Sequence, residues 1–144
     1  MIKWFYLIFI LLSVWVPAYA QPLNPFTTDG CSVFPDGTWE DRKLFLNCCT
    51  LHDFAYWQGG TVDQRLNADY QFSQCISNIG QPELAQLMLI GVRVGGSPYW
   101  PTPFRWGYGW PYPKGYGKLN ANELQQIKLL TPAIFKVYLS PVIN

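Results

Sequence analysis

The stretch from Cys48 to Asp53 holds most of the residues that are able to do chemistry, and Asp69 and Cys75 follow it. His52, within this stretch, is the only histidine of the chain. An imidazole can act as a general base near neutral pH when a carboxylate orients its ring. His52 and Asp69 therefore predict activation of a nucleophile, provided that the fold brings the two side chains together.

Two consecutive helices are expected to position these residues. The first begins at Asp36 or Thr38 and ends at the glycine pair of residues 59–60, since glycine commonly follows a last helical turn. Thr61 and Gln64 form a capping-box pattern, which opens the second helix. The connection is so short that the two helices must lie antiparallel.

Facing residues in an antiparallel pair lie equally far from the turn that connects the helices. His52 and Asp69 meet this condition, and Cys48 and Cys75 nearly meet it. Cys48 and His52 also share one stripe of the first helix because they are four residues apart. A disulfide from Cys48 to Cys75 would therefore turn His52 towards the second helix.

The chain has four cysteines, and an even number in a small exported protein usually forms disulfides. Cys49 lies about 100° around the helix from Cys48, which leaves it free to reach Cys31 in the preceding loop. Among three possible connectivities, we predict Cys31–Cys49 and Cys48–Cys75. A zinc site is the weaker alternative because the chain has one histidine and no C-x-x-C spacing.

Asp53 follows His52 and projects from another side of the same helix. Calcium binds carboxylate and backbone carbonyl oxygens, and a Cys31–Cys49 bridge would bring the oxygens of residues 29–37 near Asp53. We therefore expect a hard-cation site beside His52. The alternative is that His52 only makes structural hydrogen bonds, that Asp53 is a solvated helix residue and that Tyr56 is a core aromatic.

The remaining pattern predicts a single all-α domain over residues 21–144. Its antiparallel, disulfide-linked two-helix core lies within residues 29–80. Residues 81–144 add short helices, expected from Glu83 to about Val94 and from Asn120 to Leu130. The intervening segment is rich in Pro, Gly, Trp and Tyr, and its prolines forbid a regular helix.

Aromatic residues, which make up 17% of the chain, are concentrated between Tyr99 and Tyr116. Exposed Trp and Tyr side chains favour membrane interfaces, so this segment would suit a protein that binds a phospholipid surface. The alternative is that the rings cover the helical hairpin as core or pack against a partner. Core packing is the slightly favoured interpretation, because large aromatic residues usually stabilise small domains.

The N-terminus has the layout of a secretory signal peptide: Lys3, an apolar run from Trp4 to Leu12, and Ala18-Tyr19-Ala20. The apolar run is shorter than the roughly 20 residues that cross a bilayer, which disfavours a membrane anchor. We expect residues 1–20 to be removed after Ala20 and the protein to be secreted or periplasmic. Nine acidic and nine basic residues then remain, so the charge argues against nucleic-acid binding.

These residues resemble a known family. Cys-Cys-x-x-His-Asp followed by Tyr56 is similar to the active-site helix of secreted phospholipases A2, and His52-Asp53-Phe54-Ala55-Tyr56 resembles the motif of small bacterial members. Asp69, with Cys75 after it, matches the second helix of that family. Gly30-Cys31-Ser32 resembles the calcium loop of divergent members.

The resemblance implies a phospholipase A2-like fold and a mechanism. His52 would take a proton from a water that attacks the sn-2 ester of a phospholipid, Asp69 would hold the imidazole, and Tyr56 would hydrogen-bond Asp69. This gives a candidate catalytic set of His52, Asp69 and Tyr56. Calcium would be bound by Asp53 and by loop carbonyl groups, which belong to Gly30, Ser32 and Phe34.

Three hypotheses follow from the sequence. The first is a calcium-dependent phospholipase A2-like hydrolase. The second is a catalytically silent relative that binds lipid or protein. The loop favours this hypothesis, because residues 32–35 stand where the family usually has a glycine-rich calcium loop. If the site does bind a cation, Asp29 or Asp36 could supply a further carboxylate ligand. The third is an unrelated disulfide-bonded envelope protein in which His52 is structural. The sequence identifies no protein partner.

Overall fold

The computed structural model describes residues 21–139, and the regular secondary structure of this part is entirely helical. The predicted signal peptide, residues 1–20, lies outside the described residues. The helices are α1 (Leu46–Gln58), α2 (Val62–Asn78), α3 (Pro82–Gly95), α4 (Ala121–Leu130) and the 3-10 helix η1 (Ala133–Leu139). None of the helices in residues 21–139 is long and apolar enough to cross a membrane.

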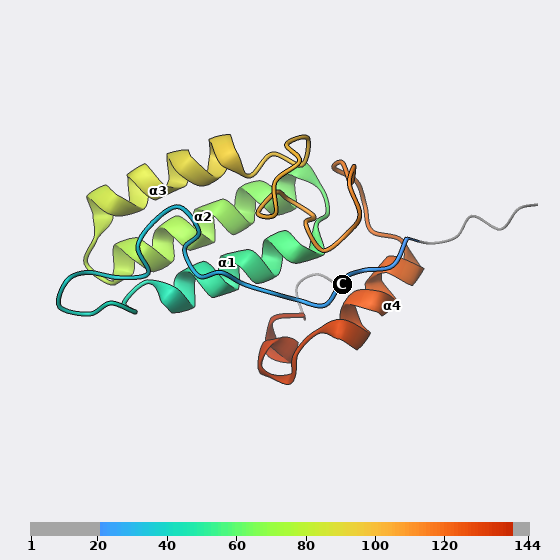
Figure 1. The fold of residues 1–144 in the computed structure, drawn as a ribbon, viewed down its shortest axis with the longest axis horizontal. Helices are drawn as coiled ribbons and strands as arrows, with labels where there is room; N and C mark the ends of the chain where they lie inside the picture. Colours follow the sequence, from blue (N-terminus) through green and yellow to red (C-terminus); the bar gives the residue numbers. More distant parts are fainter. Residues whose placement is uncertain (1–20, 140–144) are drawn as a thin grey trace, which may run out of the picture.

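Helices α1 and α2 form the predicted antiparallel hairpin (Figure 1). Gly59 follows α1 with a φ of 70°, a conformation that glycine adopts without strain. Thr61 and Gln64 make the reciprocal hydrogen bonds of a capping box at the start of α2. The disulfide Cys48–Cys75 links the two helices at the other end of the hairpin, so both ends of this unit are fixed.

The predicted start of the first helix at Asp36 or Thr38 is wrong, because α1 begins only at Leu46. Asp36 closes a loop instead of capping a helix. Its carboxylate accepts a hydrogen bond from the backbone N–H of Cys31 at 2.8 Å, and its carbonyl accepts one from Phe45 at 2.7 Å. The loop is tied to α1 by the disulfide Cys31–Cys49. Both predicted disulfide pairings are therefore confirmed.

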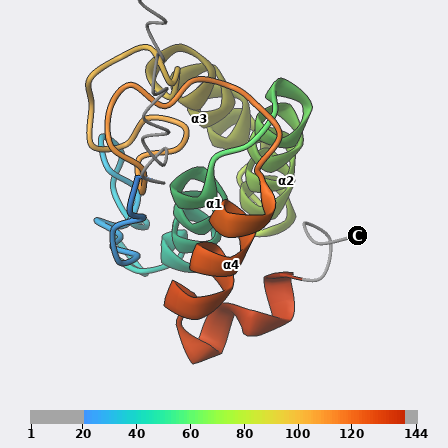
Figure 2. The same ribbon diagram turned by 90° about the vertical axis from the view of Figure 1, so that its right-hand side faces the viewer.

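The hairpin lies between helix α3 and the pair formed by α4 and η1. Helix α3 packs on α2, whereas α4 and η1 lie on the opposite side of the α1–α2 pair (Figures 1 and 2). One buried cluster fills the space among α1, α2 and α3, with Phe72, Ile76 and Met88 at its centre. A second cluster joins α1 to α4 and η1 through residues that include Trp57 and Ile127. The hairpin is thus covered on both sides.

The aromatic segment between α3 and α4 is irregular, as its prolines predict, and part of it is core. Trp106 and Trp110 are buried. Their indole N–H groups donate to the carbonyl groups of Gly60 at 3.0 Å and Gln58 at 2.8 Å, which no intrahelical donor satisfies at the end of α1. Three other aromatic residues of the segment are exposed: Tyr99, Trp100 and Tyr112. The segment therefore combines a core function with an exposed aromatic surface.

Candidate active site

The imidazole of His52 and the carboxylate of Asp69 meet across the hairpin. Nε2 of His52 lies 2.9 Å from Oδ1 of Asp69, and both side chains are buried. The pair is in place because α1 and α2 run antiparallel and are locked together by Cys48–Cys75. With Asp69 ionised, Nε2 carries the hydrogen that this bond needs, which leaves Nδ1 as the ring nitrogen able to accept a proton.

Tyr56 supports the same carboxylate. Its hydroxyl donates to Oδ1 of Asp69 at 2.7 Å, and the ring is buried one helical turn after His52 on α1. The Tyr56 hydroxyl also accepts a hydrogen bond from Nε of Arg65 at 3.0 Å. His52, Asp69 and Tyr56, the predicted catalytic set, therefore form one connected hydrogen-bond network.

Two arginines, whose contacts with Asp69 the sequence did not predict, complete the surroundings of this carboxylate. Nε of Arg93, on α3, lies 2.8 Å from Oδ2 of Asp69, and Nε of Arg65, on α2, lies 3.8 Å from it. Arg65 and Asp69 are four residues apart on α2, a spacing that places opposite charges on one helix face and was a usable signal. No periodicity links Arg93 to Asp69, because they belong to different helices.

Burial governs the protonation of the network. Desolvation lowers the pKa of His52 below its ordinary value, although the hydrogen bond and the charge of Asp69 act in the opposite direction. The imidazole is therefore neutral near pH 7 and able to accept a proton. Desolvation and the charge of Asp69 raise the pKa of Tyr56, so its hydroxyl stays protonated and donates to Asp69.

A cavity of about 320 Å³ opens beside His52 and is lined by the predicted calcium ligands. Its lining includes His52, Asp53 and the loop residues Gly30, Ser32 and Phe34. The far wall is the face of α3 that carries Met88, Gly91, Val92 and Gly95. The fold thus brings the candidate base and every predicted calcium ligand to one largely apolar cavity.

Asp53 is the only carboxylate that lines this cavity among residues 21–139. Oδ2 of Asp53 accepts a hydrogen bond from the Thr28 hydroxyl at 2.6 Å. Burial raises the pKa of Asp53 to about 7, and the nearby charge of Asp29 adds to this effect, whereas the Thr28 hydrogen bond opposes it. Asp53 is half-buried, and a cation bound beside it and the exposed Asp29 would stabilise both carboxylates in their charged form.

The loop that faces Asp53 has the backbone shape that such a site needs. Gly30 has a φ of 78°, and a Cβ there would collide with the Asp36 carboxylate. Ser32 has a φ of 54°, so it adopts the left-handed conformation that glycine usually provides. Within residues 21–139, the carbonyl oxygens of Gly30, Ser32 and Phe34 accept no hydrogen bond. A carboxylate and free carbonyl groups in one cavity fit the ligand preference of calcium.

Asp29 and Asp36, the other carboxylate ligands that the sequence offers, differ in how close they lie to the proposed cation site. Asp36 is engaged by the backbone N–H of Cys31, so it supports the loop and does not face the cavity. Asp29 accepts a hydrogen bond from the Ser32 hydroxyl at 2.8 Å and shares a smaller neighbouring pocket with Asp53. Asp29 therefore adds negative charge beside Asp53 without lining the main cavity.

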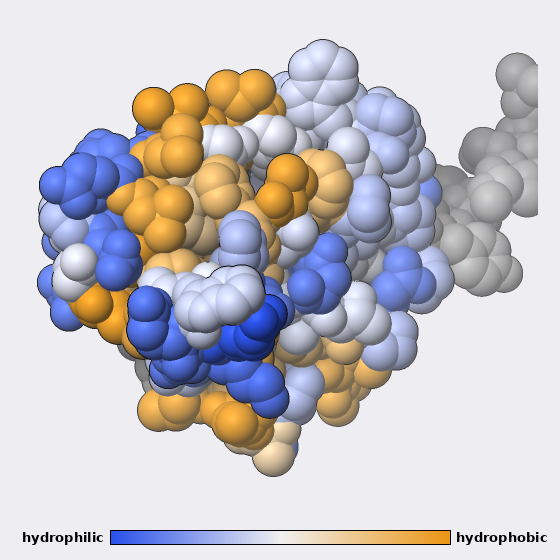
Figure 3. All heavy atoms as spheres, turned by 60° about the vertical axis from the view of Figure 1, so that its left-hand side comes forward, coloured by the Kyte–Doolittle hydropathy of each residue, from blue (hydrophilic) through white to orange (hydrophobic). Residues whose placement is uncertain are grey.

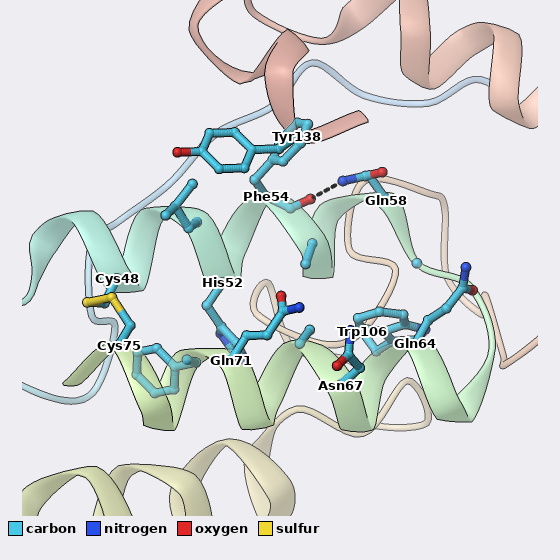
Figure 4. Close-up of a pocket in the computed structure, with 15 residues that line it drawn as sticks. Cys48, His52, Phe54, Gln58, Gln64, Asn67, Gln71, Cys75, Trp106 and Tyr138 are labelled. Carbon is cyan, nitrogen blue, oxygen red and sulfur yellow. Dashed lines mark hydrogen bonds between the residues drawn. A yellow bond between two sulfur atoms is a disulfide. The ribbon is translucent and has the colours of Figure 1, made fainter. Parts of the chain in front are cut away.

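A second cavity, of about 280 Å³, lies on another face of the hairpin (Figure 4). His52 lines this cavity as well, and Figure 4 shows it projecting from α1 towards α2 beside Gln71, between the Cys48–Cys75 disulfide and Trp106. No charged side chain lines this face among the described residues. The predicted cation ligands are absent from its lining, so the first cavity is the candidate active site.

Comparisons with family models, with curated proteins and with solved structures find no match to this chain. The geometry around His52 is therefore the basis on which a function is proposed.

Proposed function

We propose that the protein is a calcium-dependent hydrolase that cleaves the sn-2 ester of phospholipids, as the resemblance of its motif to secreted phospholipases A2 implies. The observation that carries the proposal is the buried His52–Asp69 pair, with Nε2 and Oδ1 2.9 Å apart, beside a cavity that also holds Asp53. Ester hydrolysis by water needs a general base and a group that stabilises the oxyanion. His52, oriented by the buried Asp69 behind it, would supply the first, and a cation held by Asp53 in the same cleft would supply the second.

In this proposal, Nδ1 of His52 takes a proton from a water molecule as the water oxygen attacks the ester carbonyl carbon. The imidazolium then returns a proton to the leaving alkoxide, so that the products are a fatty acid and a lysophospholipid. Asp69 accepts the Nε2 hydrogen throughout and stabilises the imidazolium. Tyr56 fixes Asp69 through its own hydrogen bond. The disulfide-linked hairpin keeps these groups aligned.

Asp53 and the carbonyl groups of Gly30, Ser32 and Phe34 would hold the calcium ion. When bound there, calcium supplies positive charge that stabilises the oxyanion formed by the ester carbonyl. The tether Cys31–Cys49 supports this function because it fixes the loop against α1 next to Asp53.

The surface around the cavity suits a phospholipid membrane as the source of substrate. Figure 3 shows hydrophobic residues gathered over α3, the helix that forms the cavity wall. The exposed residues of this helix include Leu87, Ile90 and Val94, which lie on one stripe of its surface. Val33, between the predicted ligands Ser32 and Phe34, is 82% exposed. Exposed apolar groups of this kind mark interaction surfaces, and they would place the cavity at the lipid interface.

The test is hydrolysis of phosphatidylcholine vesicles by the purified protein, with calcium or with a chelator. We expect product only with calcium, and we expect Asp53→Asn to lose the response to calcium. Asp63→Asn is the matched control, because Asp63 is exposed in the first turn of α2. Equal product in the presence of chelator would contradict the calcium site.

The catalytically silent relative, the second hypothesis from the sequence, predicts a different outcome in the same assay. It would bind the vesicles and release no fatty acid under either condition. Co-sedimentation of protein with the vesicles, measured on the same samples, distinguishes this outcome from a protein that ignores lipid.

A further inference from the structure

Asp69 is a fully buried carboxylate, and its two oxygens have different partners. Oδ1 accepts hydrogen bonds from His52 and Tyr56. Oδ2 accepts no directed hydrogen bond within residues 21–139, although Nε of Arg93 lies only 2.8 Å away. Since a buried charge without a counter-charge is costly, the guanidinium of Arg93 is the nearest group that can neutralise Oδ2.

Arg65 does not have the same function. Its Nε donates to the Tyr56 hydroxyl, another nitrogen donates to the Tyr116 hydroxyl, and the remaining one donates to the carbonyl groups of Val92 and Arg93 at 2.9 and 2.8 Å. These neutral acceptors hold its guanidinium 3.8 Å from Oδ2 of Asp69. Arg65 therefore joins α2 to the end of α3, whereas Arg93 makes the close ionic contact.

We infer that Arg93 is a positioning residue of this site: its positive charge, delivered from α3, holds the Asp69 carboxylate in place against Nε2 of His52. The expected loss of kcat when this charge is removed rests on the proposed function. The expected loss of the hydrogen bond between Asp69 and Nε2 of His52 does not. Arg93 also donates to the Leu66 carbonyl on α2 at 3.2 Å, which anchors its side chain across the helix pair.

The contact between Arg93 and Oδ2 of Asp69 is ionic and is not a hydrogen bond. Because the Arg93 N–H does not point at Oδ2 as a hydrogen bond requires, a lysine at the same position can supply the equivalent charge. The Arg93 side chain is 39% exposed, so the site tolerates a change of shape there. Arg93→Lys is therefore expected to preserve the function and Arg93→Gln to lose it.

The first measurement is steady-state hydrolysis of phosphatidylcholine vesicles with calcium by wild type, Arg93→Gln and Arg93→Lys. Arg42→Gln is the matched control, because it removes the same charge from an exposed arginine that stacks on Trp39. We expect Arg93→Gln to lower kcat by roughly 10–100-fold, the usual effect of losing an outer partner of a catalytic group, with little change in KM. Arg93→Lys should retain most of the wild-type kcat.

The second measurement is the NMR signal of the hydrogen on Nε2 of the His52 ring, which is unambiguous because the chain has one histidine. We expect slow exchange of this hydrogen with solvent in wild type, Arg93→Lys and Arg42→Gln, and fast exchange in Arg93→Gln. The inference is overturned if Arg93→Gln matches Arg42→Gln in both measurements. It is also overturned if Arg93→Lys loses both the wild-type kcat and the slow exchange of the Nε2 hydrogen.

The two proposals fail in different ways. If the wild type releases no fatty acid, the proposed function fails, and the ring signal alone decides the role of Arg93. If Arg93→Gln does not fold, which its thermal melt would show, Arg93→Lys decides the question. Retention of the ring signal by the lysine variant supports the inference, and loss of the signal refutes it.

Discussion

Replacing Tyr56 by phenylalanine removes one hydroxyl from the network around Asp69 and leaves the ring in place. That hydroxyl donates to Oδ1 of Asp69 at 2.7 Å and accepts from Nε of Arg65 at 3.0 Å. Tyr56, Arg65 and Asp69 are all buried, so water cannot replace either bond without a rearrangement. Tyr56→Phe therefore tests how much the network contributes to the fold.

The magnitude follows from the two bonds that are lost. A hydrogen bond to a charged group contributes about 1.5–3 kcal/mol, and both partners of the Tyr56 hydroxyl are charged. Arg65 keeps its contacts to backbone carbonyl groups and lies 3.8 Å from Oδ2 of Asp69, which offsets part of the loss. We expect the free energy of unfolding to fall by about 2–4 kcal/mol.

The assay is urea unfolding followed by tryptophan fluorescence with the disulfides intact. Tyr70→Phe is the matched control, because Tyr70 is 55% exposed and its hydroxyl accepts only from Gln74 among the described residues. Since His52 and Asp69 remain paired in Tyr56→Phe, the rate of hydrolysis should fall much less in this variant than in His52→Gln. A Tyr56→Phe variant as stable as Tyr70→Phe, to within about 0.5 kcal/mol, would show that the two hydrogen bonds of the Tyr56 hydroxyl do not stabilise the fold.

Three further predictions follow from the same geometry. His52→Gln removes the proposed base, so hydrolysis should fall by roughly 10²–10⁴-fold while circular dichroism stays unchanged; an unaffected rate would make His52 structural. Serine at both Cys31 and Cys49 should weaken calcium binding in calorimetry and cost about 3 kcal/mol of stability, and unchanged affinity would contradict the proposal that this disulfide positions the loop carbonyl groups for the cation. Gly95→Leu places a side chain in the cavity, so vesicle assays should show long acyl chains losing more activity than short ones; equal losses would contradict acyl binding there.

The hairpin and its cross-links were predictable because helix geometry converts positions in the sequence into positions in space. Equal distance from the turn identified the contact between His52 and Asp69, and helix rotation separated the partners of Cys48 and Cys49. The prediction succeeded because both helices are regular and their connection is short.

The start of α1 was not predictable from the same signals. Acidic residues near Asp36 are typical of a first helical turn, yet Asp36 binds the backbone of Cys31 in the structure. An aspartate can accept hydrogen bonds from free backbone N–H groups at a helix start or in a loop. The loop tethered by Cys31–Cys49 offers such a group at Cys31, and Asp36 binds it. Composition alone cannot distinguish the two cases.

The surroundings of Asp69 and Asp53 also depend on contacts that periodicity does not encode. Arg93 reaches Asp69 from α3, and Thr28 reaches Asp53 from the N-terminal loop. Both contacts depend on how a third segment packs against the hairpin. The left-handed backbone of Ser32 is similarly imposed by the loop, since serine has no strong preference for it.

The most direct test of the proposed chemistry uses a phosphatidylcholine that carries different fatty acids at its two ester positions. The purified protein and His52→Gln are compared in calcium, and the released fatty acids are identified by mass. We expect the wild type to release the sn-2 fatty acid and His52→Gln to release almost none. Equal release of both fatty acids, or equal release by the two proteins, would show that His52 does not direct hydrolysis to the sn-2 ester.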